Sequence, residues 1–150
     1  MPASLPGRIL ALDVGRRRIG LAISDPLGFT AQGLETLQRV NNRQDYDRLA
    51  HLAREKEVTL FVVGLPLHMS GDESRQAGYV REFADRLQRE TDIPIAFWDE
   101  RLTTVEAHRV LTAGGLNLEK RKKAVDRMAA VLLLENFLMA RSSGARSSAE

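Results

Sequence analysis

Hydrophobic residues form two short runs near the N-terminus, separated by a basic turn. Residues 9–14 are apolar at odd and even positions alike, except for Asp13, and this pattern is typical of a strand buried on both faces. Gly15 and three arginines follow, and residues 19–23 form a second apolar run. This order predicts two strands joined by a tight glycine turn, with one acid at the end of the first strand.

The rest of the chain shows strand and helix patterns in alternation. Further strands are expected at residues 33–37, 60–63 and 95–98, and a turn at residues 25–28. Helices are expected at residues 44–56, 103–113 and 120–141, and one more helix should follow a capping box at residues 70–73. Helical crossovers between strands make those strands parallel. The sequence therefore predicts an α/β domain with one sheet flanked by helices.

Three acids occupy positions where this pattern predicts apolar surroundings. Asp13 ends the first strand, Glu100 follows the strand at 95–98, and Asp126 lies on the apolar stripe of the last helix. An unpaired buried carboxylate costs on the order of several kcal/mol, so each acid needs a hydrogen bond, an ion pair or a metal. Two of the acids follow strands that crossovers make parallel, and open α/β sheets bind their ligands at that carboxyl edge.

The chemistry of these acids indicates a hard metal ion. The chain has no cysteine, and clustered carboxylates without Cys or His beside them suit Mg²⁺ or Mn²⁺ rather than zinc. Two such ions about 4 Å apart activate water and stabilise the leaving oxygen of a phosphodiester. Our hypothesis is that Asp13, Glu100 and Asp126 form a two-metal nuclease site.

Each acid also has an ordinary structural explanation, which the sequence leaves open. The alternative partners are the Gly15 turn for Asp13, Arg101 or Arg127 for Glu100, and Lys122 or Lys123 for Asp126. The catalytic interpretation requires the three acids to converge in space.

Composition limits the classes of protein that fit. A chain of 150 residues with 43% hydrophobic content suits one domain, which we place at residues 1–141. Residues 142–150 are rich in Ser, Ala and Arg and are expected to form a disordered tail. The absence of cysteine fits a reducing compartment, and the longest apolar run, residues 129–134, is too short to span a bilayer. We therefore expect a cytoplasmic protein without a membrane partner.

The charge distribution favours a nucleic-acid partner more than the net charge does. The formal net charge is only +2, but 18 of the 22 basic residues are Arg, and basic clusters flank Asp13 and Asp126. Arg matches phosphate geometry with two parallel hydrogen bonds. The candidate nucleic-acid-binding residues are Arg16, Arg17, Arg18, Arg101, Thr103, Lys120, Arg121, Lys122 and Lys123. The alternative is an Arg-rich solvated surface.

Four segments resemble the signature blocks of the YqgF/RuvX family of small bacterial RNase H-like nucleases. They are D-V-G-R-R-R-I-G-L-A-I-S-D from Asp13, V-G-L-P-L-H-M-S-G from Val63, D-E-R-L-T-T-V-E-A from Asp99 and V-D-R-M-A-A-V-L-L-L from Val125. The blocks occur in the family's order and cover nearly the whole chain except its two ends. The departures lie in loops: Arg16 and Arg17 replace a common Thr-Lys, and His68 and Ser70 replace a common Asn and Asp.

The resemblance implies an RNase H-like fold, in which helices flank a mixed five-stranded sheet whose second strand is antiparallel. It also implies an acidic metal site at Asp13, Glu100 and Asp126. The family is described both as Holliday-junction resolvases and as nucleases that mature the 5′ end of 16S ribosomal RNA, so the implied partner is branched DNA or an rRNA precursor. A resolvase makes paired nicks and would act as a homodimer.

Two other classes of protein share features of this sequence. Actin-like and sugar-kinase ATPases also open with a strand, a D-x-G motif and a hairpin, but they need two such lobes, and this chain has one. A non-catalytic nucleic-acid-binding factor on the same fold is the second alternative. Binding without metal-dependent cleavage would favour that class.

Overall fold

The computed structural model describes residues 7–66, 75–99 and 118–148 of the chain. The elements in these ranges are β1 (Arg8–Val14), β2 (Arg18–Ser24), β3 (Ala31–Gly33), β4 (Leu37–Gln38), α1 (Asn42–Glu55), β5 (Val58–Leu65), α2 (Arg75–Thr91), β6 (Ile95–Asp99) and α4 (Leu118–Ser148). Among these residues no helix has the length and apolarity needed to cross a bilayer. The predicted capping box at 70–73 and the predicted helix at 103–113 lie outside the described residues.

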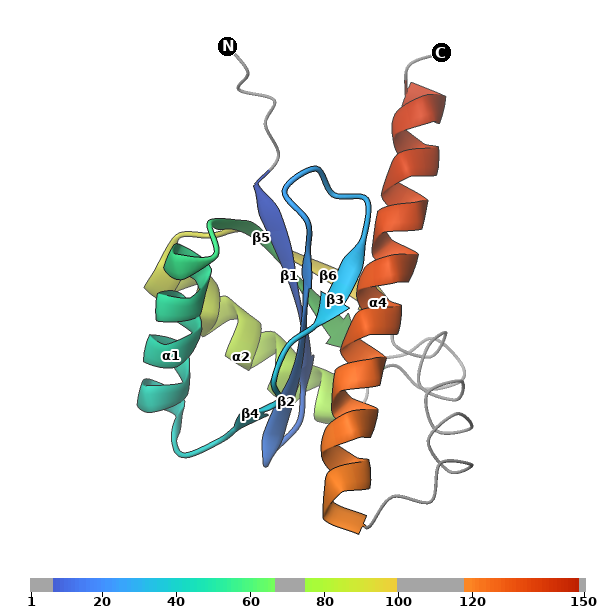
Figure 1. Cartoon of the computed structure of the whole chain (residues 1–150). Coiled ribbons are helices and arrows are strands. Elements are labelled where there is room, and N and C mark those ends of the chain that lie inside the picture. Colours follow the sequence, from blue (N-terminus) through green and yellow to red (C-terminus); the bar gives the residue numbers. More distant parts are fainter. Residues whose placement is uncertain (1–6, 67–74, 100–117, 149–150) are drawn as a thin grey trace.

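The strands form one mixed sheet with helices on both faces. The strand order is β3-β2-β1-β5-β6, and β4 also pairs with β2. β1 and β2 are antiparallel, whereas β1, β5 and β6 run parallel to one another. Helices α1 and α2 lie on one side of the sheet and α4 on the other (Figure 1). This arrangement confirms the predicted α/β fold with an antiparallel second strand.

The third predicted strand, at residues 33–37, is two short strands on the same edge of β2. β3 ends at Gly33 and β4 begins at Leu37. Between them, the carbonyl of Leu34 accepts a hydrogen bond at 3.1 Å from Nε of Arg127, which belongs to α4. The prediction of one continuous strand was wrong because this segment bonds to Arg127, 93 residues further along the chain, and local pattern does not reveal a contact over that separation.

Side-chain alternation along β1 builds two hydrophobic cores. Leu10 and Leu12 join the core under α1 and α2, whereas Ile9 and Ala11 join the core under α4. All four are at most 2% exposed. Both faces of β1 are therefore buried, as its continuous apolar pattern predicted, and Asp13 is the next residue on the α4 side.

Helix α4 is longer than predicted. The pattern ended this helix at residue 141 and predicted a disordered tail, but the helix continues to Ser148 (Figure 1). Ala and Arg are good helix formers, and a single glycine such as Gly144 costs only about 1 kcal/mol in a helix. No residue in this segment forces the helix to end, so the predicted end of the helix at residue 141 was too early, whereas the predicted domain boundary at that residue stays a prediction.

The loop between β2 and β3 is organised by one carboxylate, as the turn signal predicted. Asp25 Oδ1 accepts hydrogen bonds from the backbone N–H groups of Leu27 (2.8 Å) and Phe29 (3.2 Å). Its Oδ2 accepts from the backbone (2.8 Å) and the hydroxyl (2.6 Å) of Thr30. The hydroxyl bond is the main reason that the pKa of Asp25 falls from 3.8 to about 2.

The Asp25→Asn substitution is expected to lower stability in a pH-dependent way. The lowered pKa means that the Asp25 carboxylate stabilises the fold above about pH 4 and loses this effect as the pH falls toward 2. Thermal unfolding of wild type and variant should therefore show a gap in Tm near neutral pH that closes in acid. Asp47→Asn is the control, since that exposed carboxylate has no hydrogen-bond partner among the described residues. A gap that is independent of pH would contradict the prediction.

Candidate active site

Asp13 lies at the carboxyl end of β1, on the face that α4 covers. Side chains alternate along a strand, and Ile9 and Ala11 already face α4, so Asp13 faces it too. The Asp13 side chain is half-buried. Its position is the carboxyl edge of the parallel strands, where the sequence pattern placed it.

Glycines flank Asp13 on both neighbouring strands. Gly20 of β2 is its partner in the sheet. On β5, Val63 pairs with Leu12, so the next residue, Gly64, lies level with Asp13. Residues at one level of a sheet face the same side, and glycine has no side chain. At this level of the sheet, neither neighbouring strand adds a side chain beside Asp13.

Gly20 also lets the backbone of α4, at Asp126, lie directly on the sheet. A Cβ atom on Gly20 would lie 2.0 Å from the carbonyl oxygen of Asp126 and 3.2 Å from its Cα. Only glycine permits so close an approach. Asp13 and Asp126, which are far apart in the sequence, are thus both neighbours of the same glycine.

The Asp126 carboxylate is held by an arginine from the sheet. Nε of Arg18 donates to Asp126 Oδ2 at 2.8 Å, and the two side chains are 22% and 23% exposed. The sequence had suggested Lys122 or Lys123 as the partner of Asp126, but both of those side chains are exposed on α4. Arg18 was predicted to bind phosphate, and that role stays a prediction; its Nε pairs with one of the predicted acids.

The third predicted acid, Glu100, lies outside the described residues, together with Arg101 and Thr103. Glu100 directly follows Asp99, the last residue of β6, which pairs with Leu65 at the carboxyl end of β5. Within the described ranges, no three His, Asp or Glu side chains form a metal-binding group. The structure therefore places two of the three predicted acids beside Gly20, Asp13 through sheet pairing and Asp126 through its backbone. The catalytic role of all three acids remains a prediction.

The remaining basic candidates lie on both sides of the two acids. Arg16 and Arg17 are exposed in the turn between β1 and β2. Lys120, Lys122 and Lys123 are exposed on the first turns of α4. The position of the Arg121 side chain is outside what the structure describes.

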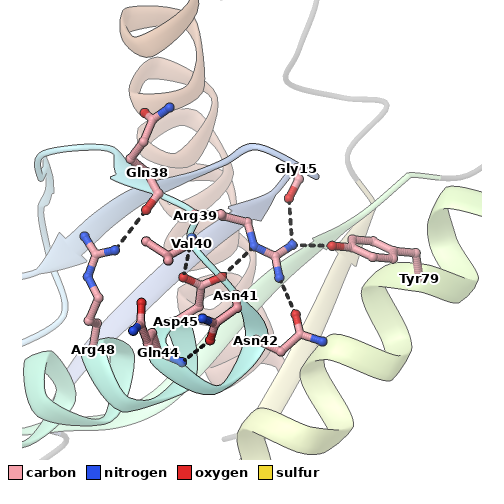
Figure 2. A network of polar contacts seen from close by, with 10 residues as sticks. All are labelled: Gly15, Gln38, Arg39, Val40, Asn41, Asn42, Gln44, Asp45, Arg48 and Tyr79. Carbon is pink, nitrogen blue, oxygen red and sulfur yellow. Dashed lines mark hydrogen bonds and ion pairs between the residues drawn. The ribbon is translucent and has the colours of Figure 1, made fainter.

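A buried arginine that the sequence reasoning missed fixes the turn after Asp13. Arg39 donates to the carbonyl of Gly15 at 3.0 Å, to Asp45 Oδ2 at 2.9 Å, to Asn42 Oδ1 at 2.7 Å and to the hydroxyl of Tyr79 (Figure 2). The Arg39 side chain is 7% exposed, and that of Asp45 is fully buried. This arginine links the β1–β2 turn to both α1 and α2.

The network keeps Arg39 charged. Burial by itself lowers the pKa of Arg39, but the hydrogen bonds to Asp45 and Tyr79 outweigh it, so the pKa is raised above its ordinary value. Asp45 also accepts a hydrogen bond from the backbone N–H of Val40 at 3.1 Å. The charged guanidinium of Arg39 thus anchors the β1–β2 turn, which contains Arg16 and Arg17.

The sequence matches a family model over residues 7–140, which is most of the chain, and that model is described as "RuvX: Holliday junction resolvase". The chain belongs to the RuvX family. A relative from Koribacter versatilis (strain Ellin345), named "Putative pre-16S rRNA nuclease", is 53% identical over 137 residues, covering 91% of this chain and 90% of the relative. A relative of the same name from Clostridium novyi (strain NT) is 49% identical over 131 residues, covering 87% and 97%.

Solved structures of resolvases share the fold of this RuvX family member. T. thermophilus RuvC in complex with a Holliday junction substrate superposes with a TM-score of 0.57 at 14% identity, over 91% of this chain and 96% of RuvC. Fowlpox virus resolvase in complex with Holliday junction DNA gives a TM-score of 0.55 at 10% identity, over 89% and 97%. Identities this low bear on the fold alone, and they confirm the predicted RNase H-like fold.

Gly20 can be tested as the contact point between the sheet and α4. The Gly20→Ala substitution is expected to lower the free energy of unfolding by about 3 kcal/mol, because the new methyl group meets a backbone carbonyl that cannot rotate away. Chemical denaturation measures the change. The matched control is Gly78→Ala in α2, where a Cβ meets nothing within 4 Å and alanine should add up to about 1 kcal/mol of stability. Equal stability of the two variants would show that α4 does not rest on Gly20.

Proposed function

We propose that this RuvX family member is a metal-dependent nuclease that hydrolyses phosphodiester bonds of structured nucleic acid. Its proposed substrate is the 5′ end of the 16S rRNA precursor, in the cytoplasm. The observation that carries the proposal is that Asp13 and the backbone of Asp126 both lie beside Gly20, at the end of β1 that forms the carboxyl edge of the sheet. The names of the curated relatives support the choice of substrate.

The residues at this edge fit a hard divalent cation. Asp13 and Asp126 offer carboxylate oxygens, the ligands that Mg²⁺ and Mn²⁺ prefer, and the glycines level with Asp13 on β2 and β5 add no side chain beside it. We infer that these two acids, with Glu100, hold two such ions. When bound, the ions lower the pKa of water and offset the charge that develops on the phosphodiester.

The protein's own residues would orient this chemistry. Arg18 holds one oxygen of Asp126 and so sets the direction of the other. Arg16 and Arg17 would contact substrate phosphates on the turn that follows Asp13, and Lys120, Lys122 and Lys123 would do so from α4. These contacts position the strand without reading its sequence, so binding should weaken as the salt concentration rises. No side-chain nucleophile is needed.

The test is cleavage of two labelled substrates by the purified chain with Mg²⁺ or Mn²⁺. One substrate is a 16S rRNA precursor with its 5′ leader, and the other is a four-way DNA junction. Shortening of the precursor with the junction left intact supports the proposal. Paired symmetric nicks in the junction alone would instead identify a resolvase, which would act as a homodimer; the description of the family model favours that second candidate.

Failure of both reactions would contradict the proposal. The chain would then fit the non-catalytic nucleic-acid-binding class, and equilibrium binding of the same two substrates would show it. Hydrolysis of ATP is not expected, since the family model that covers residues 7–140 is one of resolvases.

A further inference from the structure

A hollow of about 370 Å³ lies beside the β1–β2 turn, next to the first turn of α1 and to α2. We call it the Tyr79 hollow. Its lining includes Arg16, Arg17, Arg39, Asn42, Asp45 and Tyr79. Tyr79 lies on α2, which covers the opposite face of the sheet from α4 (Figure 1). The hollow is therefore separate from the two acids but shares with them the turn that follows Asp13.

The Tyr79 hollow carries unbalanced positive charge. Three arginines line it against one carboxylate, and that carboxylate, Asp45, is already paired with Arg39. In the described part of the chain, neither Arg16 nor Arg17 forms an ion pair. A concave surface with uncompensated arginines attracts anions, and the planar guanidinium group suits phosphate in particular.

The hollow also presents a flat surface. The guanidinium carbon of Arg16 lies over the ring of Tyr79, 4.4 Å from its centre. The Tyr79 hydroxyl is held by Arg39, which Asp45 and the Gly15 carbonyl hold in turn (Figure 2). Unpaired bases stack on aromatic rings and on guanidinium planes, and a tyrosine ring held by a hydrogen bond loses little entropy when a base binds.

We propose that the Tyr79 hollow binds one unpaired nucleotide of the substrate strand. The base packs against the Arg16–Tyr79 pair, and the adjoining phosphate binds Arg17. This inference rests on the proposed function, because the strand held here is the one whose neighbouring phosphodiester reaches Asp13. Only the short β1–β2 turn joins Asp13 to Arg16, so a strand bound in the hollow is led past the acids.

The experiment is binding of a fluorescently labelled single-stranded RNA to the full chain, followed by anisotropy. The Asp13→Asn background prevents cleavage during the measurement. Tyr79→Leu, which removes the ring, is expected to weaken binding about tenfold. Arg17→Gln should weaken binding and reduce the slope of log affinity against log salt by about 0.7. Tyr79→Phe keeps the ring and removes only the hydroxyl bound by Arg39, so it should lose clearly less affinity than Tyr79→Leu.

Two controls separate stacking from other effects. Arg86 also lies over a tyrosine ring, that of Tyr46, but its charge is paired with Glu90. The Arg86→Gln substitution should therefore leave the affinity for single-stranded RNA unchanged. A fully paired RNA duplex of the same length offers no unpaired base, so Tyr79→Leu should not weaken its binding, whereas Arg17→Gln should.

Three results would overturn the inference. The first is a Tyr79→Leu variant that binds single-stranded RNA as tightly as the parent. The second is a Tyr79→Phe variant that loses as much affinity as Tyr79→Leu. The third is a Tyr79→Leu variant that loses as much affinity for the duplex as for the single strand. Cleavage by the wild-type chain is measured separately, so the proposed nuclease function can hold even if the Tyr79 hollow does not bind a nucleotide. If the wild-type chain cuts neither substrate, the proposed function fails whatever the hollow binds.

Discussion

Replacing Asp13 by Asn is expected to lower the rate of nucleic-acid cleavage by at least about a hundredfold. A bound divalent ion contributes several kcal/mol to stabilising the transition state of phosphodiester hydrolysis, and about 1.4 kcal/mol corresponds to a factor of ten. Asparagine keeps the size of the side chain but removes the negative charge that holds the ion. The measurement is the initial rate on whichever substrate the wild type cleaves, over a range of Mg²⁺ or Mn²⁺ concentrations.

The control for Asp13→Asn is Asp47→Asn, a change of the same kind on the exposed side of α1. That variant should cleave at the wild-type rate. Thermal unfolding of both variants shows whether the fold is intact. Wild-type activity in a folded Asp13→Asn protein would rule out the proposed metal site and leave Asp13 as a cap of the Gly15 turn.

Replacing Arg39 by Met is expected to cost about 3–5 kcal/mol of stability, the usual cost of breaking a buried ion pair by removing one partner. The fully buried Asp45 would lose the guanidinium that neutralises it. The Gly15 carbonyl would also lose a donor, so the turn that carries Arg16 and Arg17 would be held less firmly. Urea denaturation at neutral pH measures the change in free energy of unfolding.

Arg48→Met is the matched control for Arg39→Met. Arg48 also donates a hydrogen bond to the segment before α1, at 2.8 Å to the carbonyl of Gln38 (Figure 2), but it is exposed. Its loss should cost less than about 1 kcal/mol. If Arg39→Met cost no more than this control, the network would not anchor the turn.

Local pattern predicted most of the elements and the places of two acids within them. The continuous apolar run at β1 marked a strand buried on both faces, and the acid at its end marked the carboxyl edge of the sheet. The inward stripe of the last helix likewise placed Asp126 against the sheet. These features depend on residues a few positions apart, so periodicity alone reveals them. The same reasoning missed the break between β3 and β4 and the end of α4, because no local signal marks either.

The pairing of groups within the site was decided by the tertiary structure. Glycine inside the second strand, at position 20, was a signal for close backbone approach, but the sequence does not say that the approaching group is Asp126. Nor does it say that Arg18 pairs with this acid, or that Arg39 reaches back to Gly15. These contacts join residues that are distant in the chain, and they form only when the sheet and the helices on its two faces have packed. The sequence by itself thus determined the strand and helix pattern and the chemistry available at the sheet edge, whereas packing determined which side chains meet there.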